Sequence, residues 1–140
     1  MILLDTSVLS VAFRRRRPSG ADGQTAMALR RLVTADAPLA VPGIVLQELL
    51  GGVRDERQFA RLEGLIEGFE VVLAERRDHL AAARIANACR RAGIATSTID
   101  CLIAALAIER SGTLFTLDSD FTRMAPHCGL RLWRPERGGA

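Results

Sequence analysis

Short apolar runs alternate with longer segments of helical periodicity along the chain. Apolar residues with helical spacing cover 8–13, 21–35, 44–50, 55–66, 78–92 and 99–109, with a helical turn at 119–124. The runs short enough for buried strands lie at 2–4, 39–41, 69–73 and 113–117, and a fifth strand is expected at 130–133. This alternation predicts an α/β fold in which helices cover both faces of a parallel sheet of four to five strands.

The length of the chain bounds its organisation. A chain of 140 residues buries a sufficient core as one domain without disulfides or a structural metal. We expect that domain at 1–134 and a frayed, glycine-rich tail at 135–140. No apolar run reaches the ~18–20 residues of a membrane helix, and the first residues lack the basic start of a signal peptide. The three cysteines are widely spaced, without the pairing of a zinc site. We therefore expect a cytoplasmic protein with reduced thiols and no membrane contact.

The basic residues are all arginines. Nineteen arginines face 16 acidic residues, for a net charge of +3, and there is no lysine. A GC-rich genome explains this simply, although the planar guanidinium also suits phosphate. The run Arg14, Arg15, Arg16 and Arg17 precedes a Pro-Ser-Gly loop and is a candidate for binding RNA phosphates. With five Phe, one Trp and no Tyr, few side chains can stack on bases.

Acidic residues follow two of the predicted strands. Asp5 ends the first strand, and Asp118 follows the strand at 113–117, with Asp120 two residues further on. Each could instead cap the helix that follows it. Ligands of parallel sheets bind beyond the carboxyl ends of the strands, so these positions are the expected place for a site.

Two further acids stand in apolar helical surroundings. Glu48 has Ile44, Val45 and Leu49 as helical neighbours, and Asp100 opens the long apolar helix. Burial of a single carboxylate is costly unless it is paired or binds a cation. For each acid, capping or pairing with an arginine remains an alternative to cation binding.

Together these acids indicate a metal site. In a parallel sheet, Asp5, Glu48, Asp100 and Asp118 can converge at one edge, where their charges would repel unless cations lay between them. Oxygen ligands without His or Cys favour Mg²⁺ or Mn²⁺ over zinc. Such a site supports metal-assisted attack of water on a phosphodiester.

Three segments in order, LLDTSVL, VLQELLGG and STIDCLIAALAIERSGTLFTLDSDF, resemble the PIN domain, and specifically the VapC-type toxins of bacterial toxin–antitoxin pairs. The resemblance covers nearly the whole chain. It implies a PIN domain at 1–134 with a Rossmann-like sheet sandwiched between helices, and a Mg²⁺- or Mn²⁺-dependent endoribonuclease acting on RNA.

The resemblance also implies roles for particular residues. Asp5, Glu48, Asp100 and Asp118 match the four family acids and are expected to be catalytic. Asp5, Asp100 and Asp118 are expected to bind the metal, and Glu48 and Asp120 are further candidate ligands. Thr6 and Thr116 match hydroxyl residues that orient the acids.

Two protein partners follow from the resemblance. One is a VapB-type antitoxin, whose C-terminal segment would block the acidic cleft. Its apolar helix is expected in a groove of the first helices, near Val8, Val11, Ala12, Leu29 and Leu32. The other is a second copy of the chain in a homodimer.

Two other functions compete with the nuclease. A phosphotransfer protein of the receiver or haloacid-dehalogenase kind also gathers acids at strand ends. It needs a lysine and a second aspartate at the place of Ser7, and the chain has neither. A non-catalytic domain that only binds RNA or a protein would not need all four acids intact.

Overall fold

A parallel sheet of four short strands forms the centre of the computed structural model, which describes residues 1–14 and 16–136. The strand order is β3-β2-β1-β4, and every pairing is parallel. The strands are β1 Ile2–Leu4, β2 Leu39–Pro42, β3 Glu70–Val72 and β4 Thr113–Phe115. The predicted parallel sheet is therefore confirmed, with β1 between β2 and β4.

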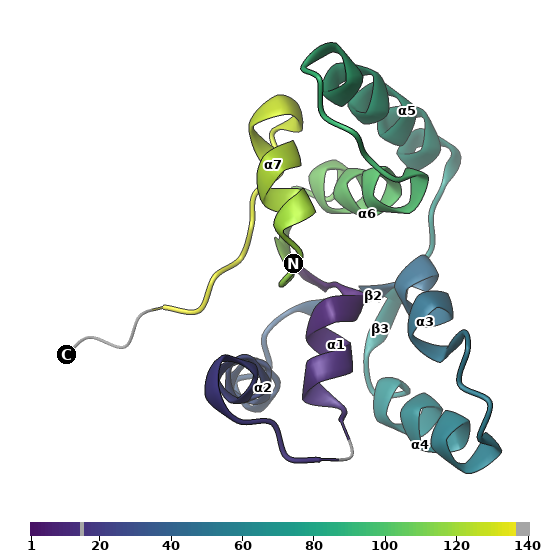
Figure 1. Cartoon of the computed structure of the whole chain (residues 1–140), viewed down its shortest axis with the longest axis vertical. Helices are drawn as coiled ribbons and strands as arrows, with labels where there is room; N and C mark the ends of the chain where they lie inside the picture. The colour runs from purple at the N-terminus through teal and green to yellow at the C-terminus, as the bar shows by residue number, and fades with distance from the viewer. Residues whose placement is uncertain (15, 137–140) are drawn as a thin grey trace.

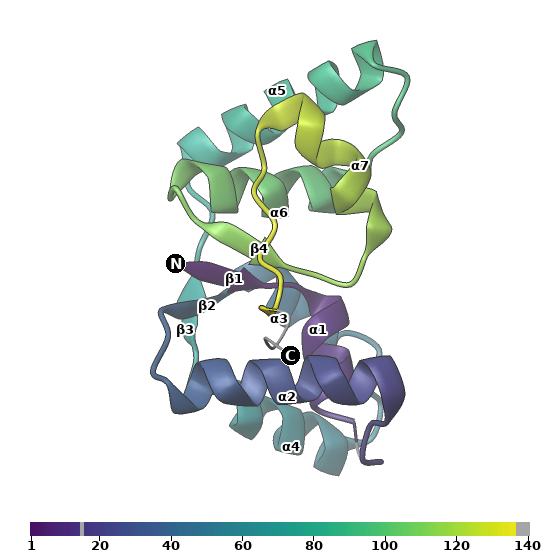
Figure 2. The same ribbon diagram turned by 90° about the vertical axis from the view of Figure 1, so that its left-hand side faces the viewer.

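Seven helices lie on the two faces of this sheet in the described chain (Figures 1 and 2). One layer contains α1 Thr6–Ala12, α2 Gly20–Thr34, α3 Gly43–Leu50 and α4 Glu56–Ile66. The other contains α5 Arg76–Arg91, α6 Thr98–Glu109 and α7 Ser119–Cys128. This is the α/β/α sandwich expected from the sequence.

The C-terminal elements differ from the prediction. The fifth strand expected at 130–133 is reduced to one parallel bridge between Leu114 and Leu132. The expected helical turn at 119–124 is a helix of ten residues, and it ends at Gly129, whose positive φ of 76° suits glycine. Phe121 and Met124 are buried, so the predicted part of α7 is the part that packs into the core. The tail expected at 135–140 lies outside the described residues from 137 onward.

The hydrophobic core is formed largely by residues of the central strands and of α6. Leu3 and Leu4 of β1 are completely buried, as are Ala104 and Ala105 of α6. A helix that is apolar around its circumference belongs in the interior, which explains why α6 lies directly against the sheet. Its N-terminus, and Asp100 with it, is thereby fixed relative to the ends of β1 and β4.

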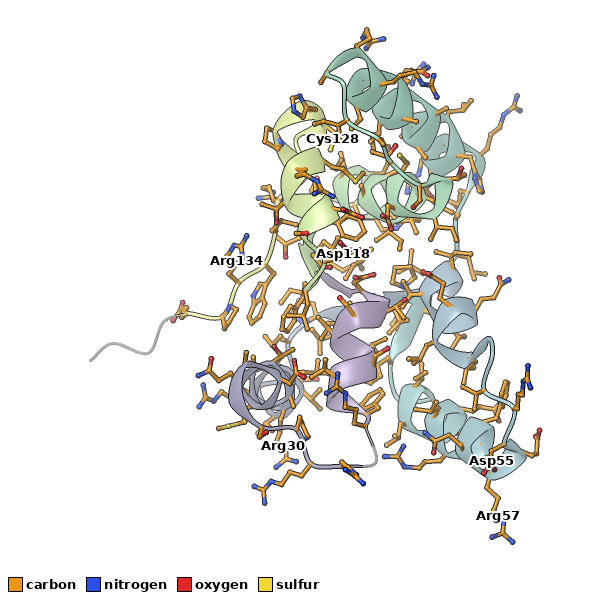
Figure 3. The ribbon with its side chains drawn as sticks, viewed as in Figure 1. Arg30, Asp55, Arg57, Asp118, Cys128 and Arg134 are labelled. Carbon is orange, nitrogen blue, oxygen red and sulfur yellow. The ribbon has the colours of Figure 1, made fainter. Side chains whose placement is uncertain are left out.

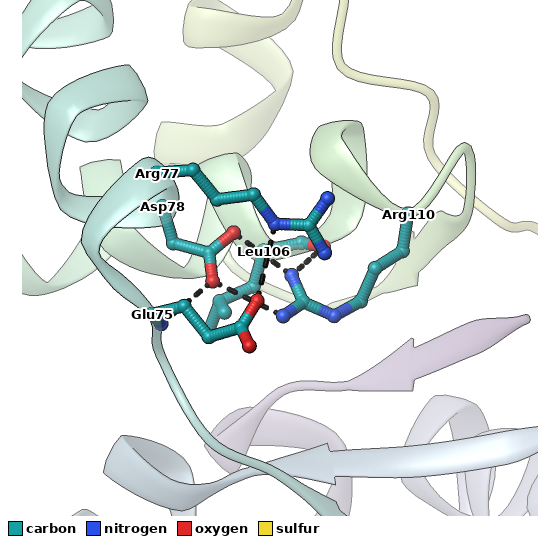
Figure 4. A network of polar contacts seen from close by, with 5 residues as sticks. All are labelled: Glu75, Arg77, Asp78, Leu106 and Arg110. Carbon is teal, nitrogen blue, oxygen red and sulfur yellow. Dashed lines mark hydrogen bonds and ion pairs between the residues drawn. The ribbon is translucent and has the colours of Figure 1, made fainter.

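A buried ion pair ties α5 to α6 (Figure 4). The Asp78 side chain is 0% exposed, and the Arg110 guanidinium donates to both of its oxygens, at 2.9 and 3.1 Å. Asp78 Oδ2 also accepts from the Glu75 backbone N–H at 2.9 Å as part of a capping box. Arg110 also donates to the Leu106 carbonyl at 3.0 Å. The sequence did not single out this pair, because Asp78 stands in a strongly charged segment.

No helix in residues 1–14 and 16–136 combines the length and the apolar character needed to cross a membrane.

Candidate metal centre

Asp5 is positioned by the end of β1. Its backbone N–H donates to the Phe115 carbonyl at 3.0 Å, and the residue is 6% exposed. Asp5 occupies the N-cap position of α1, yet its carboxylate makes no capping hydrogen bond. Its Oδ2 instead accepts from the hydroxyls of Ser7, at 2.8 Å, and Thr116, at 2.7 Å. The alternative that Asp5 is only a helix cap is therefore wrong.

The same hydroxyls connect Asp5 to the turn between β4 and α7. Thr116 Oγ1 accepts from the Asp118 N–H at 3.0 Å, and Ser7 Oγ accepts from the Leu117 N–H at 3.0 Å. Thr116 thus contacts the acids as expected. Ser7 makes equivalent contacts, which no local pattern in the sequence indicates.

Helix starts place the remaining aspartates. Asp118 caps α7, because its Oδ1 accepts from the Asp120 N–H at 2.9 Å. The interpretation of Asp118 as a helix cap is therefore correct, and the residue lies in the site as well. The Asp100 N–H donates to Ser97 Oγ, the cap of α6, at 3.0 Å. One carboxylate oxygen from each of Asp100, Asp118 and Asp120 lies within 4.8 Å of the others.

The charges of four acids meet at Asp100. Partial burial is the main cause that raises the pKa of its carboxyl, and the Ser97 hydroxyl opposes it through a hydrogen bond. The negative charges of Asp118, Asp5 and Glu48 raise this pKa further. The charges of the four acids predicted from the sequence therefore act on one another, but the carboxylate oxygens grouped within 4.8 Å belong to Asp100, Asp118 and Asp120, without Asp5 or Glu48.

Glu48 differs from its prediction in burial. Its apolar helical neighbours indicated a buried carboxylate, but the residue is exposed, and its Oε1 accepts from the Thr6 hydroxyl at 3.3 Å. On α3, Val45 and Leu49 are buried in the core, whereas Glu48, in the turn between them, stays exposed. Among residues 1–14 and 16–136, the acid that is completely buried is Asp78.

Asp120 has a competing partner. It forms a close ion pair with Arg123, one turn further along α7, and both side chains are about half exposed. An exposed pair of this kind contributes little to stability.

The donor set of the cluster fits a hard divalent cation. All its candidate ligands are carboxylates, and hydroxyls fix the orientation of Asp5. The described cluster contains no imidazole or thiolate, and both His79 and His127 are exposed. Oxygen donors suit Mg²⁺ or Mn²⁺, and the repulsion that raises the pKa of Asp100 is what a cation would relieve.

The arginines of the run at 14–17 have different surroundings. Arg14 forms an exposed ion pair with Asp22 at 2.8 Å, Arg16 is exposed, and Arg15 lies outside the described residues. Arg17 lines a cavity of about 470 Å³ between α2 and the end of α1. The role of this run in binding RNA stays a prediction.

That cavity lies by the first helices, where a groove was expected from the sequence, but of the five residues expected to line it only two do so. Val8 and Val11 are buried in the core and cannot be part of a surface. Ala12 and Leu29 do line the groove, whereas its exposed apolar residues come from the outer side of α2. These are Met27, 54% exposed, and Val33, 52% exposed.

The PIN domain family matches residues 2–126, and the chain belongs to this family. The chain is 37% identical over 129 residues to VapC ribonuclease Mb1587 of Mycobacterium bovis, across 89% of this chain and 92% of that protein. Its fold resembles FitAcB from Neisseria gonorrhoeae, with 22% identity, a TM-score of 0.76 and coverage of 98% and 99% of the two chains. VapBC-5 from Mycobacterium tuberculosis, a member of the VapBC family of toxin–antitoxin systems, matches with 19% identity, a TM-score of 0.66 and coverage of 95% and 97%.

Proposed function

We propose that this protein is an endoribonuclease toxin that hydrolyses RNA phosphodiester bonds with Mg²⁺ or Mn²⁺. The observation that carries the proposal is the meeting of Asp100, Asp118 and Asp120 beside Asp5 at the carboxyl edge of a parallel sheet. The 37% sequence identity to a VapC ribonuclease, over most of both chains, also supports endoribonuclease activity.

The acids of the site divide between binding and orientation. Asp100, Asp118 and Asp120 would hold the cation, with Asp5 and Glu48 completing the ligand set. When bound, the cation supplies positive charge that stabilises the charge developing on the phosphate and lowers the pKa of the attacking water. Ser7 and Thr116 both donate to Oδ2 of Asp5 and so would fix the orientation of its carboxylate beside the cluster. Thr6 orients Glu48 at the exposed side.

Incubation of the purified protein with structured RNA tests the proposal. We expect cleavage with Mg²⁺ or Mn²⁺ and none with a chelator, because the clustered carboxylates repel phosphate unless a cation neutralises them. Restoration of cleavage by added Mn²⁺ after chelation is the control for irreversible damage. Cleavage that persists unchanged in chelator contradicts the metal-dependent mechanism. Autophosphorylation by a small phosphodonor would favour the phosphotransfer alternative, although the chain lacks a lysine for it.

We also propose a VapB-type antitoxin as the partner in the cytoplasm. The groove beside α2 offers exposed apolar side chains for an antitoxin helix, and Arg17 and Arg30 at its rim offer charge for acidic residues. An antitoxin arginine or lysine could then replace the cation's charge at the acids. A homodimer is part of the proposal, since Leu73 and Leu80 are 71% and 53% exposed.

Expression in bacteria tests the toxin and its partner together. Expression of this chain alone is expected to arrest growth, and co-expression of the neighbouring gene is expected to restore it. Met27→Asp should lower antitoxin affinity without a loss of RNA cleavage, because Met27 lies in the groove and not at the acids. Harmless expression of folded protein would contradict the toxin, but not the nuclease.

A further inference from the structure

A second cavity opens directly beside the acid cluster. It has a volume of about 240 Å³ and lies between the β4–α7 turn and the segment that follows α7. Asp118 lines both this cavity and the cluster. Figure 3 shows Asp118 where α7 begins and Arg134 on the C-terminal segment beside it. The lining residues are Thr116, Leu117, Asp118, Ser119, Thr122, Leu132, Trp133 and Arg134.

The wall formed by Trp133 is fixed in place by the sheet. The backbone N–H of Trp133 donates to the Leu114 carbonyl at 2.8 Å, and the backbone N–H of Leu114 donates to the Arg131 carbonyl at 3.0 Å. The indole packs on Phe115 with ring centroids 4.5 Å apart. These contacts hold the ring in a defined position, half-buried, with part of its surface on the cavity. A ligand that binds here therefore does not have to immobilise the indole, so little side-chain entropy is lost on binding.

The polar groups of the cavity are available to a ligand. The hydroxyls of Ser119 and Thr122 make no hydrogen bond to any residue in 1–14 and 16–136. The exposed Arg134 guanidinium has no ion pair within the same residues. Leu117, 47% exposed, adds an apolar surface to the lining of the cavity.

We propose that this cavity binds the nucleobase of a nucleotide next to the scissile phosphodiester, with Trp133 as the stacking surface and Arg134 as the phosphate contact. This rests on the proposed endoribonuclease function and adds a subsite to it. A ring for stacking, hydroxyls for base edges and a guanidinium for phosphate are the groups that bind single-stranded nucleic acid. A volume below the ~300 Å³ of small drug sites suits one base.

The chain carries its own probe for this subsite. Trp133 is its one tryptophan, and it has no tyrosine, so tryptophan fluorescence reports on this cavity alone. The full chain with Mg²⁺ would be titrated with a short single-stranded DNA, and then with a DNA of equal length and charge whose sugars carry no bases. We expect base-bearing DNA to quench the emission and baseless DNA to leave it unchanged, because stacking needs the base.

Substitutions distinguish stacking of a base on Trp133 from the general effect of positive charge. Trp133→Leu should raise KM for RNA roughly 5- to 150-fold with little change in kcat, and Trp133→Phe should recover most of that loss. Arg134→Gln should weaken binding, whereas Arg57→Gln, at the far end of α4, should not (Figure 3). Thermal melting would confirm that each variant is folded.

The outcomes distinguish this inference from the proposed function. Equal quenching by both DNAs, or equal effects of the two arginine variants, overturns the nucleobase subsite. If base-bearing DNA leaves the emission of the unsubstituted protein unchanged, or if Trp133→Leu has an unchanged KM, the nucleobase subsite is overturned. Normal RNA cleavage in the same experiments would leave the proposed ribonuclease activity intact. Weaker antitoxin binding as the sole effect would assign the cavity to the protein partner and overturn the inference as well. Base-dependent quenching without any RNA cleavage would support the subsite and contradict the proposed function.

Discussion

Asp100→Asn is expected to lower RNA cleavage at least about a hundredfold while the protein stays folded. Asp100 shares the cluster with Asp118 and Asp120, and its amide replacement removes an ionised ligand without changing its size. The measurement is the single-turnover cleavage rate of the variant with saturating Mg²⁺. Asp5→Asn is expected to have a similar effect, since the charge of its carboxylate acts on Asp100.

Metal-free protein provides an independent readout for the same variant. Burial and three neighbouring acids raise the pKa of Asp100, so its ionised form is disfavoured in the folded state. Removal of that charge should therefore raise the melting temperature at neutral pH in chelator. Glu63→Gln is the matched control, because it removes one charge from an exposed position of α4. Wild-type cleavage by Asp100→Asn would contradict the proposed mechanism.

Asp78→Ala is expected to lower the free energy of unfolding by roughly 3–5 kcal/mol, the largest effect on stability away from the metal centre. The substitution leaves the Arg110 guanidinium, 14% exposed, without its carboxylate in the interior. Urea denaturation measures the loss. The double variant Asp78→Leu with Arg110→Leu should recover much of it, because no uncompensated charge remains. Arg77→Ala, which breaks an exposed contact with Glu75, should cost no more than about 1 kcal/mol.

The same pair makes stability depend on acid pH. The Arg110 hydrogen bonds hold the pKa of Asp78 below its usual value; burial opposes them, while the Glu75 backbone bond and the charges of Arg110 and Arg77 add to them. Since the folded pKa lies below the unfolded value of about 3.9, this stabilisation is complete above that value. It is lost as the pH falls through the folded pKa. Asp78→Ala should lack this part of the acid dependence, and an unchanged profile would contradict the assignment.

The sequence located the acids more reliably than it described their environments. Asp5 and Asp118 were found because parallel strands end at a common edge, and the structure brings them into one site with Asp100. Glu48 was expected to be buried because its neighbours along α3 are apolar. Burial depends on how closely other elements pack around a residue, and Glu48 stays exposed although Thr6 of α1 donates a hydrogen bond to it.

The tertiary contacts explain what the sequence analysis missed. Ser7 contacts Thr116 from 109 residues away, and Asp78 meets Arg110 across 32 residues. Neither pair has a local signature, because charged and hydroxyl residues occur throughout solvated segments. The same holds for Trp133, which lies at the site only because its segment returns to pair with β4.

Periodicity and composition therefore determined the order of the elements, the parallel sheet and the edge at which its acids gather. These follow from short-range rules, since the spacing of apolar residues dictates which segments become strands or helices and parallel connection places the strand ends together. Only the tertiary structure decided which acid is buried and paired, which hydroxyls orient Asp5 and where the single indole lies. Those features depend on contacts between residues distant in sequence, whose geometry is set when the layers pack.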